Sequence, residues 1–262
     1  MDKFISSFFN LKSAFVILTT LLTSNYIFAQ ENYTPDRPGI GNGSYVVEAG
    51  VFGLETGVQL STGNAVNQFD IGQMLLRFGV MENLELRALL NSYSTQYFDR
   101  TDAVNSGFQD LGLAAKYKLY EAEDGQTRIS TIGKISVPVG ASAFTNDEIV
   151  PTLFLVGDQS LTNNLSISSN LGYTFGVGDL SDNWLFTLTP GFSFPNQQNL
   201  SAYAGYAGIY DGNNTNLHYA EAGLALVVND GAQLDLNAGY EFERESFFIG
   251  IGFAQGFATA RN

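Results

Sequence analysis

The chain has 262 residues and a formal net charge of −14, with 26 acidic side chains against 12 basic ones. This acidity argues against nucleic acid as a partner, because phosphate backbones are bound by clusters of Lys and Arg. The absence of cysteine and the single histidine exclude a disulfide scaffold and argue against a zinc centre, so neither a metal nor another cofactor is expected.

The first 29 residues have the pattern of a secretory signal peptide. Lys3 and Lys12 make a basic start, an apolar run follows over residues 14–22, and Ala29 supplies a small residue at the cleavage point. Threonine, serine and asparagine residues end the apolar run well before the roughly 20 residues that a membrane-spanning helix needs. We therefore expect residues 1–29 to be removed on export.

Two further regions follow the signal peptide. Residues 30–43 are expected to form an irregular periplasmic segment, because Pro35 and Pro38 discourage regular strand pairing. From residue 44 to residue 262, apolar and polar side chains alternate in short runs, as they do over residues 165–175. Period-two alternation is typical of strands whose two faces meet different surroundings, so we expect residues 44–262 to form one all-β domain.

Twelve such runs can be placed along the chain. They lie near residues 44–60, 66–79, 83–98, 108–120, 126–138, 150–160, 164–176, 183–194, 199–210, 216–228, 232–242 and 245–257. After an export signal, this pattern predicts an antiparallel up-and-down transmembrane β-barrel, which must be closed because lipid cannot satisfy open sheet edges. With both ends in the periplasm the strand number is even, which allows ten or fourteen as well as twelve.

The connections between these runs alternate in length. Tight links lie at residues 81–83, 162–164, 195–199 and 229–231, and longer ones at 99–107, 139–149 and 176–183. Bacterial barrels have short periplasmic turns and longer outer loops. We therefore expect the outer membrane of a Gram-negative bacterium, with outer-membrane lipid and the barrel assembly machinery as partners.

The alternation also predicts which face of each strand meets lipid. In the run 232–242, Leu234, Leu236 and Tyr240 share one face, whereas Asp235 and Glu241 share the other. A Lys or Arg facing lipid at mid-bilayer would cost roughly 2–4 kcal/mol, so the charged faces are assigned to the lumen.

Ten charged side chains are therefore candidates to line the lumen: Arg77, Glu85, Arg87, Asp110, Lys116, Lys118, Arg128, Lys134, Asp235 and Glu241. The basic ones lie on the second to fifth strands, and no Lys or Arg occurs between residues 135 and 243. One interpretation is a transverse field across a narrow pore that selects polar solutes. The other is a filled interior, in which Glu55, Glu85 and Asp110 neutralise Arg77, Arg87 and Lys116. Both stay open.

Several short motifs, in this order, resemble a known family. They are Asp36-Arg37-Pro38-Gly39, Leu76-Arg77-Phe78-Gly79, Asp110-Leu111-Gly112-Leu113 and Ser136-Val137-Pro138-Val139-Gly140. With them the chain resembles the outer-membrane β-barrel transporter family of meta-pathway phenol degradation proteins. The resemblance implies a barrel through which small solutes pass, aromatic or apolar ones among them.

The leading hypothesis is a channel-like barrel for passive passage of small solutes, without enzymatic activity. A non-conducting structural barrel with a filled lumen is the alternative. A membrane-embedded hydrolase would need a serine against His218, and the candidate serines are scattered at Ser166, Ser168, Ser193 and Ser201. A soluble secreted barrel would need its apolar side chains to point inwards.

Overall fold

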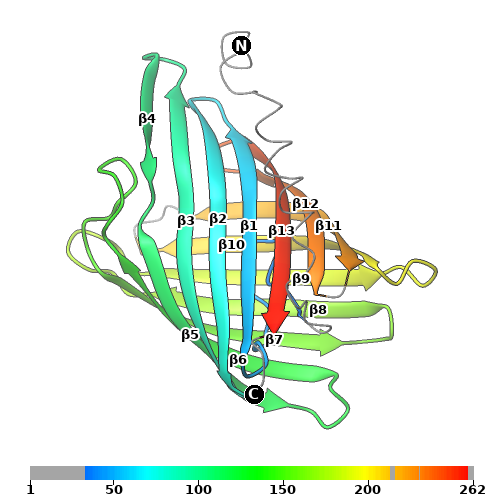
Figure 1. Ribbon diagram of the computed structural model, residues 1–262. Helices are drawn as coiled ribbons and strands as arrows, with labels where there is room; N and C mark the ends of the chain where they lie inside the picture. The colour runs from blue at the N-terminus through cyan, green and yellow to red at the C-terminus, as the bar shows by residue number, and fades with distance from the viewer. Residues whose placement is uncertain (1–32, 213–215, 230, 259–262) are drawn as a thin grey trace.

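The computed structural model describes residues 33–212, 216–229 and 231–258, so the expected signal peptide lies outside the described residues. The strands form one antiparallel sheet, which Figure 1 shows curving around a central space. The sheet closes because β3 pairs with β2 along one edge and with β4 and β5 along the other. The fold is therefore the predicted closed all-β barrel.

Most of the strand bounds agree closely with the predicted runs. The strands are β1 (Val51–Thr62), β2 (Val66–Met81), β3 (Leu84–Phe98), β4 (Ala103–Phe108), β5 (Leu111–Glu121), β6 (Thr127–Val137), β7 (Val150–Ser160), β8 (Leu165–Thr174), β9 (Asn183–Ser193), β10 (Leu200–Asp211), β11 (Leu217–Asn229), β12 (Ala232–Glu241) and β13 (Ser246–Ala258).

β4 and β5 together occupy the place of one predicted strand. β4 pairs with the second half of β3 and β5 with its first half. At the break, Gln109 donates its backbone N–H to the carbonyl of Ser92 at 3.0 Å, and the Asn91 side chain donates to the carbonyl of Asp110. The thirteen strands therefore make a wall of twelve, as predicted.

The long connection expected at residues 99–107 is wrong. Ala103–Phe108 continues the hairpin as β4, which leaves residues 99–102 as the turn. The ring of Phe108 packs edge-on against that of Tyr93, with ring centroids 5.1 Å apart. Such cross-strand aromatic pairs stabilise hairpins, which explains why pairing extends further than the alternation suggested.

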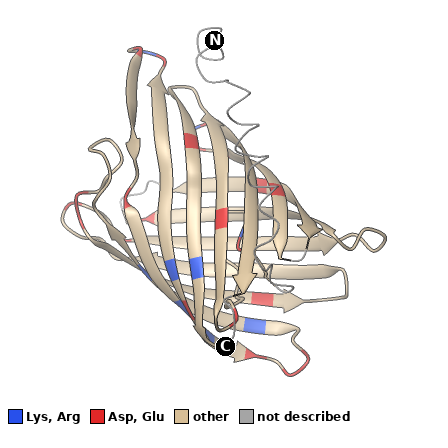
Figure 2. Cartoon of the chain, viewed as in Figure 1, with Lys and Arg blue, Asp and Glu red and all other residues tan. Residues whose placement is uncertain are grey.

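Apolar side chains point outwards from the barrel wall and charged ones point inwards, as predicted. Ile251 on the outer face is 58 % exposed, whereas Glu55 and Lys116 on the inner face are fully buried. Figure 2 shows long uncharged stretches along the strands, with basic bands grouped on neighbouring strands. The soluble barrel, which needs the reverse polarity, is therefore wrong, and the chain is an outer-membrane barrel of a Gram-negative bacterium.

Among the described residues no helix is both long and apolar enough to cross a bilayer, a finding that concerns helices alone.

The two ends of the barrel differ in their connections. β1 begins and β13 ends at the same end, where Val51 pairs with Ala258. β2 and β3 are linked at this end by residues 82–83, whereas the opposite end carries the longer loops 138–149 and 175–182. Because short turns of such barrels lie in the periplasm, the end with the short links is assigned to the periplasm.

Residues 33–50, called the lumen segment below, differ from the prediction. β1 begins at Val51 rather than at residue 44, and the lumen segment forms no strand, only an isolated bridge between Ala49 and Gly79. The segment also does not lie outside the barrel as a periplasmic lead-in. Hydrogen bonds place it inside, against the charged faces of several strands, and these contacts define the candidate site.

Glycines make room for the lumen segment. Two pairs of glycines face each other across β1 and β13: Gly53 with Gly256 and Gly57 with Gly252. A Cβ on Gly53 would lie 2.4 Å from the ring of Tyr33, and one on Gly252 would lie 2.2 Å from the guanidinium of Arg37. No real Cβ contact is that short, so the missing side chains form a groove that holds Tyr33 and Arg37.

Candidate functional site

Three basic side chains meet in the middle of the lumen. Arg77 comes from β2, Arg87 from β3 and Lys116 from β5, and all three are buried. Arg77 lies directly opposite Arg87 in the pairing of β2 with β3. Like charges that face each other across a sheet are destabilising, so this arrangement requires carboxylates nearby.

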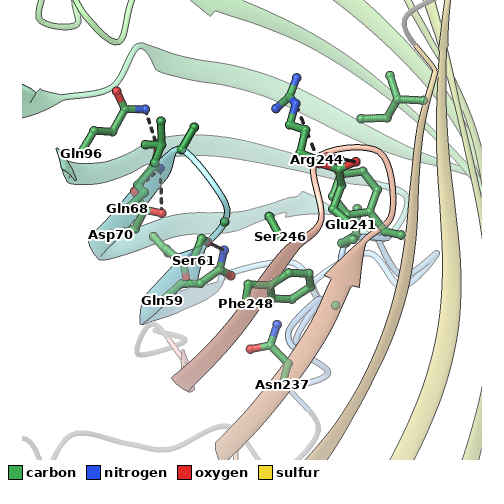
Figure 3. A pocket seen from close by; sticks show the side chains of 18 of the residues that line it. Gln59, Ser61, Gln68, Asp70, Gln96, Asn237, Glu241, Arg244, Ser246 and Phe248 are labelled. Atoms are coloured by element: carbon green, nitrogen blue, oxygen red, sulfur yellow. Dashed lines mark hydrogen bonds and ion pairs between the residues drawn. The ribbon is translucent and has the colours of Figure 1, made fainter. Parts of the chain in front are cut away.

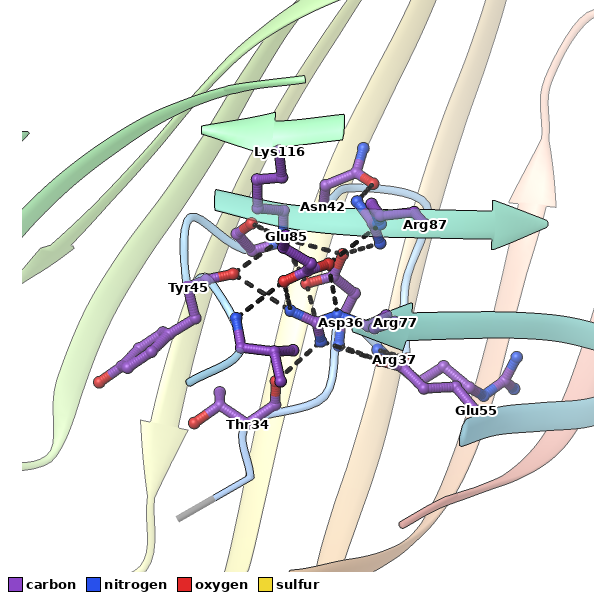
Figure 4. A network of polar contacts seen from close by, with 12 residues as sticks. Thr34, Asp36, Arg37, Asn42, Tyr45, Glu55, Arg77, Glu85, Arg87 and Lys116 are labelled. Atoms are coloured by element: carbon purple, nitrogen blue, oxygen red, sulfur yellow. Dashed lines mark hydrogen bonds and ion pairs between the residues drawn. The ribbon is translucent and has the colours of Figure 1, made fainter. Parts of the chain in front are cut away.

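Two wall carboxylates neutralise part of this charge (Figure 4). Arg77 lies 2.9 Å from Glu55 on β1 and 2.8 Å from Glu85 on β3. Glu85 also lies 3.3 Å from Arg87. The filled-interior hypothesis correctly predicted that Glu55 and Glu85 neutralise the arginines.

Asp110, expected to neutralise Lys116, does not reach it. Its carboxylate accepts the backbone N–H groups of Gly140 at 3.0 Å and Asn146 at 3.1 Å, and so holds the outer loop 138–149. The two residues lie six positions apart in the chain, which is about 20 Å along an extended strand. Side chains that far apart along one strand do not meet, even when they share a face.

The partner of Lys116 is Asp36 in the lumen segment. The Asp36 carboxylate lies 3.1 Å from the Lys116 Nζ and 3.6 Å from Arg77, contacts Arg87, and accepts the backbone N–H of Gly43 at 3.3 Å. Figure 4 shows Asp36 at the centre of the network. Three carboxylates, those of Asp36, Glu55 and Glu85, thus balance the three cations.

Asp36 is held in its ionised form. Burial by itself would raise the pKa of Asp36, but Arg77, Lys116 and Arg87 outweigh burial and hold this pKa below the ordinary carboxyl range. The Asp36 carboxylate therefore stays ionised at neutral pH.

The lumen segment is also bound through its backbone. Its N–H groups donate to side chains on five strands at 2.7–3.0 Å: Asp36 and Arg37 to Glu55, Ile40 to Glu221, Asn42 to Asn170, Ser44 to Asp158 and Val47 to Glu85. These acceptors lie on β1, β11, β8, β7 and β3. The segment therefore crosses the lumen from one side of the wall to the other, and most of its acceptors are carboxylates.

Cavities lie on both sides of the lumen segment. The outer one, shown in Figure 3, has a volume of about 970 Å³ and is lined by Arg37 and Ile40 of the segment. The inner one has about 840 Å³ and is lined by Tyr33 and Tyr45 of the segment. The segment therefore separates the two cavities and lines one side of each.

The outer cavity is lined mainly by polar side chains. Figure 3 shows Gln59, Gln68 and Gln96 on one side and Glu241 on the other, with the ring of Phe248 nearby. Amides are the commonest polar side chains in this lining, so the cavity offers both hydrogen-bond donors and acceptors.

The other predicted lumen residues lie away from the central network. Asp235 is 3.2 Å from Arg37 of the lumen segment, and Glu241 is 3.8 Å from Arg244 at the outer end. At the inner end, Lys118 and Arg128 both pair with Glu121, at 2.8 and 2.6 Å. Lys134 makes no ion pair with any described residue, and its Nζ lies 5.9 Å from the centre of the Phe154 ring.

The four predicted residues that do meet are Arg77, Glu85, Arg87 and Lys116. Sequence reasoning missed Asp36 as the residue that joins them. Two signals pointed to it: Asp36 begins the Asp-Arg-Pro-Gly motif, and glycines recur on the inner faces of the first and last strands. Neither signal says that residues 33–50 enter the barrel.

The surroundings of His218 do not favour a hydrolase. Its Nδ1 lies 2.6 Å from the hydroxyl of Tyr206, its Nε2 lies 3.8 Å from Glu243, and its ring packs near Tyr210. The serine contact that a hydrolase requires is not among the hydrogen bonds of the described residues.

Comparisons with known proteins agree with this architecture. The family described as "Putative MetA-pathway of phenol degradation" matches residues 35–257. Among solved structures, the COG4313 outer membrane channel from Pseudomonas putida F1 is 13% identical with a TM-score of 0.66, over 84% of this chain and 100% of that one. The KdgM porin in complex with disordered oligogalacturonate is 11% identical with a TM-score of 0.54, over 78% and 98%. The NanC porin is 9% identical with a TM-score of 0.54, over 77% and 98%.

At these identities the solved structures establish a shared barrel fold. No curated protein matches the chain in sequence.

Proposed function

The chain belongs to the family described as "Putative MetA-pathway of phenol degradation", and from that premise we propose that it is an outer-membrane channel for the passive passage of small solutes. The observation that carries the proposal is the pair of cavities, of about 970 and 840 Å³, on the two sides of the lumen segment. Sites for small molecules have volumes of about 300–1,000 Å³. A barrel whose only task is structural has no need of such space at both ends.

The proposed solutes are small molecules that combine an aromatic or apolar part with a polar group. Phe248, Ile209 and Tyr219 contribute apolar surface to the outer cavity, next to amides such as Gln59 and Gln68. This mixture suits a ring that carries a hydrogen-bonding group, and the family description points to the same class.

The lumen segment is proposed to control passage. It divides the lumen, and apart from its continuation into β1 it is held by hydrogen bonds and ion pairs. Passage requires that it move or leave, so the intact protein is expected to conduct weakly. No catalytic role and no cofactor are proposed for any part of the barrel.

A planar-bilayer recording tests this function. Purified wild-type protein is compared with a variant that lacks residues 34–46, and the deletion is expected to raise single-channel conductance several-fold because the segment no longer fills the middle of the lumen. A matched control replaces Lys118 by Ala, which breaks an ion pair with Glu121 at the inner end rather than a contact of the segment.

The ion-paired middle of the lumen favours the second candidate function, a non-conducting structural barrel. The same recording separates the two. If neither the wild-type protein nor the deletion variant conducts any ion or solute, the channel proposal fails and the structural one stands.

A further inference from the structure

The site that holds Asp36 is built almost entirely by the barrel wall. Lys116, Arg87 and Arg77 come from three strands, and all three lie close to the Asp36 carboxylate, with Lys116 at 3.1 Å and Arg77 at 3.6 Å. Asp36 itself belongs to the lumen segment, which is not part of the wall. Cations from three wall strands thus surround a carboxylate that the lumen segment supplies.

Without Asp36 this part of the wall carries unbalanced positive charge. Arg77, Arg87 and Lys116 would then face only Glu55 and Glu85. The buried Nε of Arg87 lies 3.3 Å from Glu85 but makes no hydrogen bond, so this donor is left over even when the segment is bound. Buried cations require anionic partners, so an empty site would attract another carboxylate.

The wall beside these cations carries apolar side chains. Ile132 is opposite Lys116 on the neighbouring strand and is only 2 % exposed, and Phe154 follows on the strand after that. Two strand spacings amount to about 10 Å, the reach of a carboxylate joined to one aromatic ring. Lys134, which makes no ion pair with any described residue, lies over Phe154.

We propose that the cluster of Arg77, Arg87 and Lys116 binds the carboxylate of a small aromatic acid on its way through the barrel, and that Asp36 occupies this site when the solute is absent. The ring of the solute lies against Ile132 and Phe154. The inference rests on the proposed function, because a solute reaches these residues only when the lumen segment moves.

Thermal unfolding of the purified mature barrel in detergent tests the site without requiring transport. The Asp36→Ala variant is heated with sodium benzoate, or with benzyl alcohol, which has the same ring without the charge. Benzoate is expected to raise the unfolding temperature of this variant, and benzyl alcohol is not. The wild-type protein should respond far less, because the tethered Asp36 competes at a high effective concentration.

Two control variants isolate the role of charge. Asp158→Ala removes another carboxylate that binds the segment, through Ser44, but it frees no cation, so benzoate should not stabilise it more than benzyl alcohol does. Asp36→Ala combined with Lys116→Met restores the balance of charge and should lose the response to benzoate. If Asp36→Ala does not fold into a barrel, Asp36→Asn removes the charge with little change in shape and is used in its place.

The inference is overturned if benzoate stabilises Asp36→Ala and Asp36→Asn no more than benzyl alcohol does. A bilayer recording separates this failure from failure of the channel proposal. If the variants conduct but do not respond to benzoate, only the proposed carboxylate site is overturned. Variants that bind benzoate but never conduct overturn its role in transport and the proposed function together.

Discussion

At the residue scale, the middle of the lumen contains buried charged side chains that neutralise one another. Arg77 is 1 % exposed and pairs with Glu55 and Glu85, while Asp36 balances what remains. A buried ion pair by itself contributes little net stability, but removing one partner leaves the other charges buried without a counter-charge. Each member of this network is therefore more sensitive to substitution than a charge at the barrel ends.

Replacing Arg77 by Met should destabilise the barrel by about 3–5 kcal/mol, because Glu55 would be left buried without its cation and Glu85 would keep only Arg87. Urea unfolding of the barrel reconstituted in lipid vesicles measures this loss. The control is Lys118→Ala, which breaks an ion pair with Glu121 between two side chains that are each about one-third exposed, so a loss of at most about 1 kcal/mol is expected. Equal losses for the two variants would contradict the central role of Arg77.

At the element scale, the strands and the lumen segment obey different rules. Strands are specified by local alternation, because each side chain faces either lipid or lumen. The lumen segment has no regular alternation of apolar and polar residues, and its position depends on contacts with the barrel wall. The facing glycines of β1 and β13 show this dependence, because they leave room for Tyr33 and Arg37.

Filling the glycine groove should displace the segment without opening the barrel. In the variant Gly252→Val the new side chain would occupy the place of Arg37, so single-channel conductance should rise toward that of the segment deletion. Gly133→Val is the matched control on β6, because a Cβ there meets nothing within 4 Å. A Gly252→Val protein that conducts like wild type would show that the groove does not hold the segment in place.

At the scale of the whole molecule, closure joins chain ends that lie far apart in the sequence. Val51 at the start of β1 pairs with Ala258 at the end of β13. The closed wall has an apolar outside and an ionised inside, which requires a membrane around it and a route of export to reach that membrane.

The mature protein should therefore begin at Gln30 and fractionate with the outer membrane. There it should migrate differently on gels before and after boiling, because a closed barrel resists unfolding by detergent at room temperature. Mass spectrometry of the protein extracted from that membrane gives its N-terminus. Recovery in the soluble periplasmic fraction, or with Met1 retained, would contradict residues 1–29 as a cleaved signal peptide and the barrel as the mature domain.

Much of the fold could be predicted from the sequence. Most of the strands begin and end within about two residues of the predicted runs, and the assignment of faces placed Arg77, Glu85, Arg87 and Lys116 in the lumen. The short hairpin strand β4 was missed, since residues 103–108 alternate too weakly to stand out. Within the candidate site, Glu55 and Glu85 were identified as partners of the arginines, whereas Asp36 was not.

The alternation by itself determined the strands, the closure and the polarity of the wall, because a period of two is a local property that each strand carries in its own residues. Only the tertiary structure decided what fills the lumen. The contacts of the segment join Arg37 to Asp235, Ile40 to Glu221 and Asn42 to Asn170, which are 198, 181 and 128 positions apart. No local pattern encodes such partners, since they meet only after the wall has closed and brought distant strands around one space.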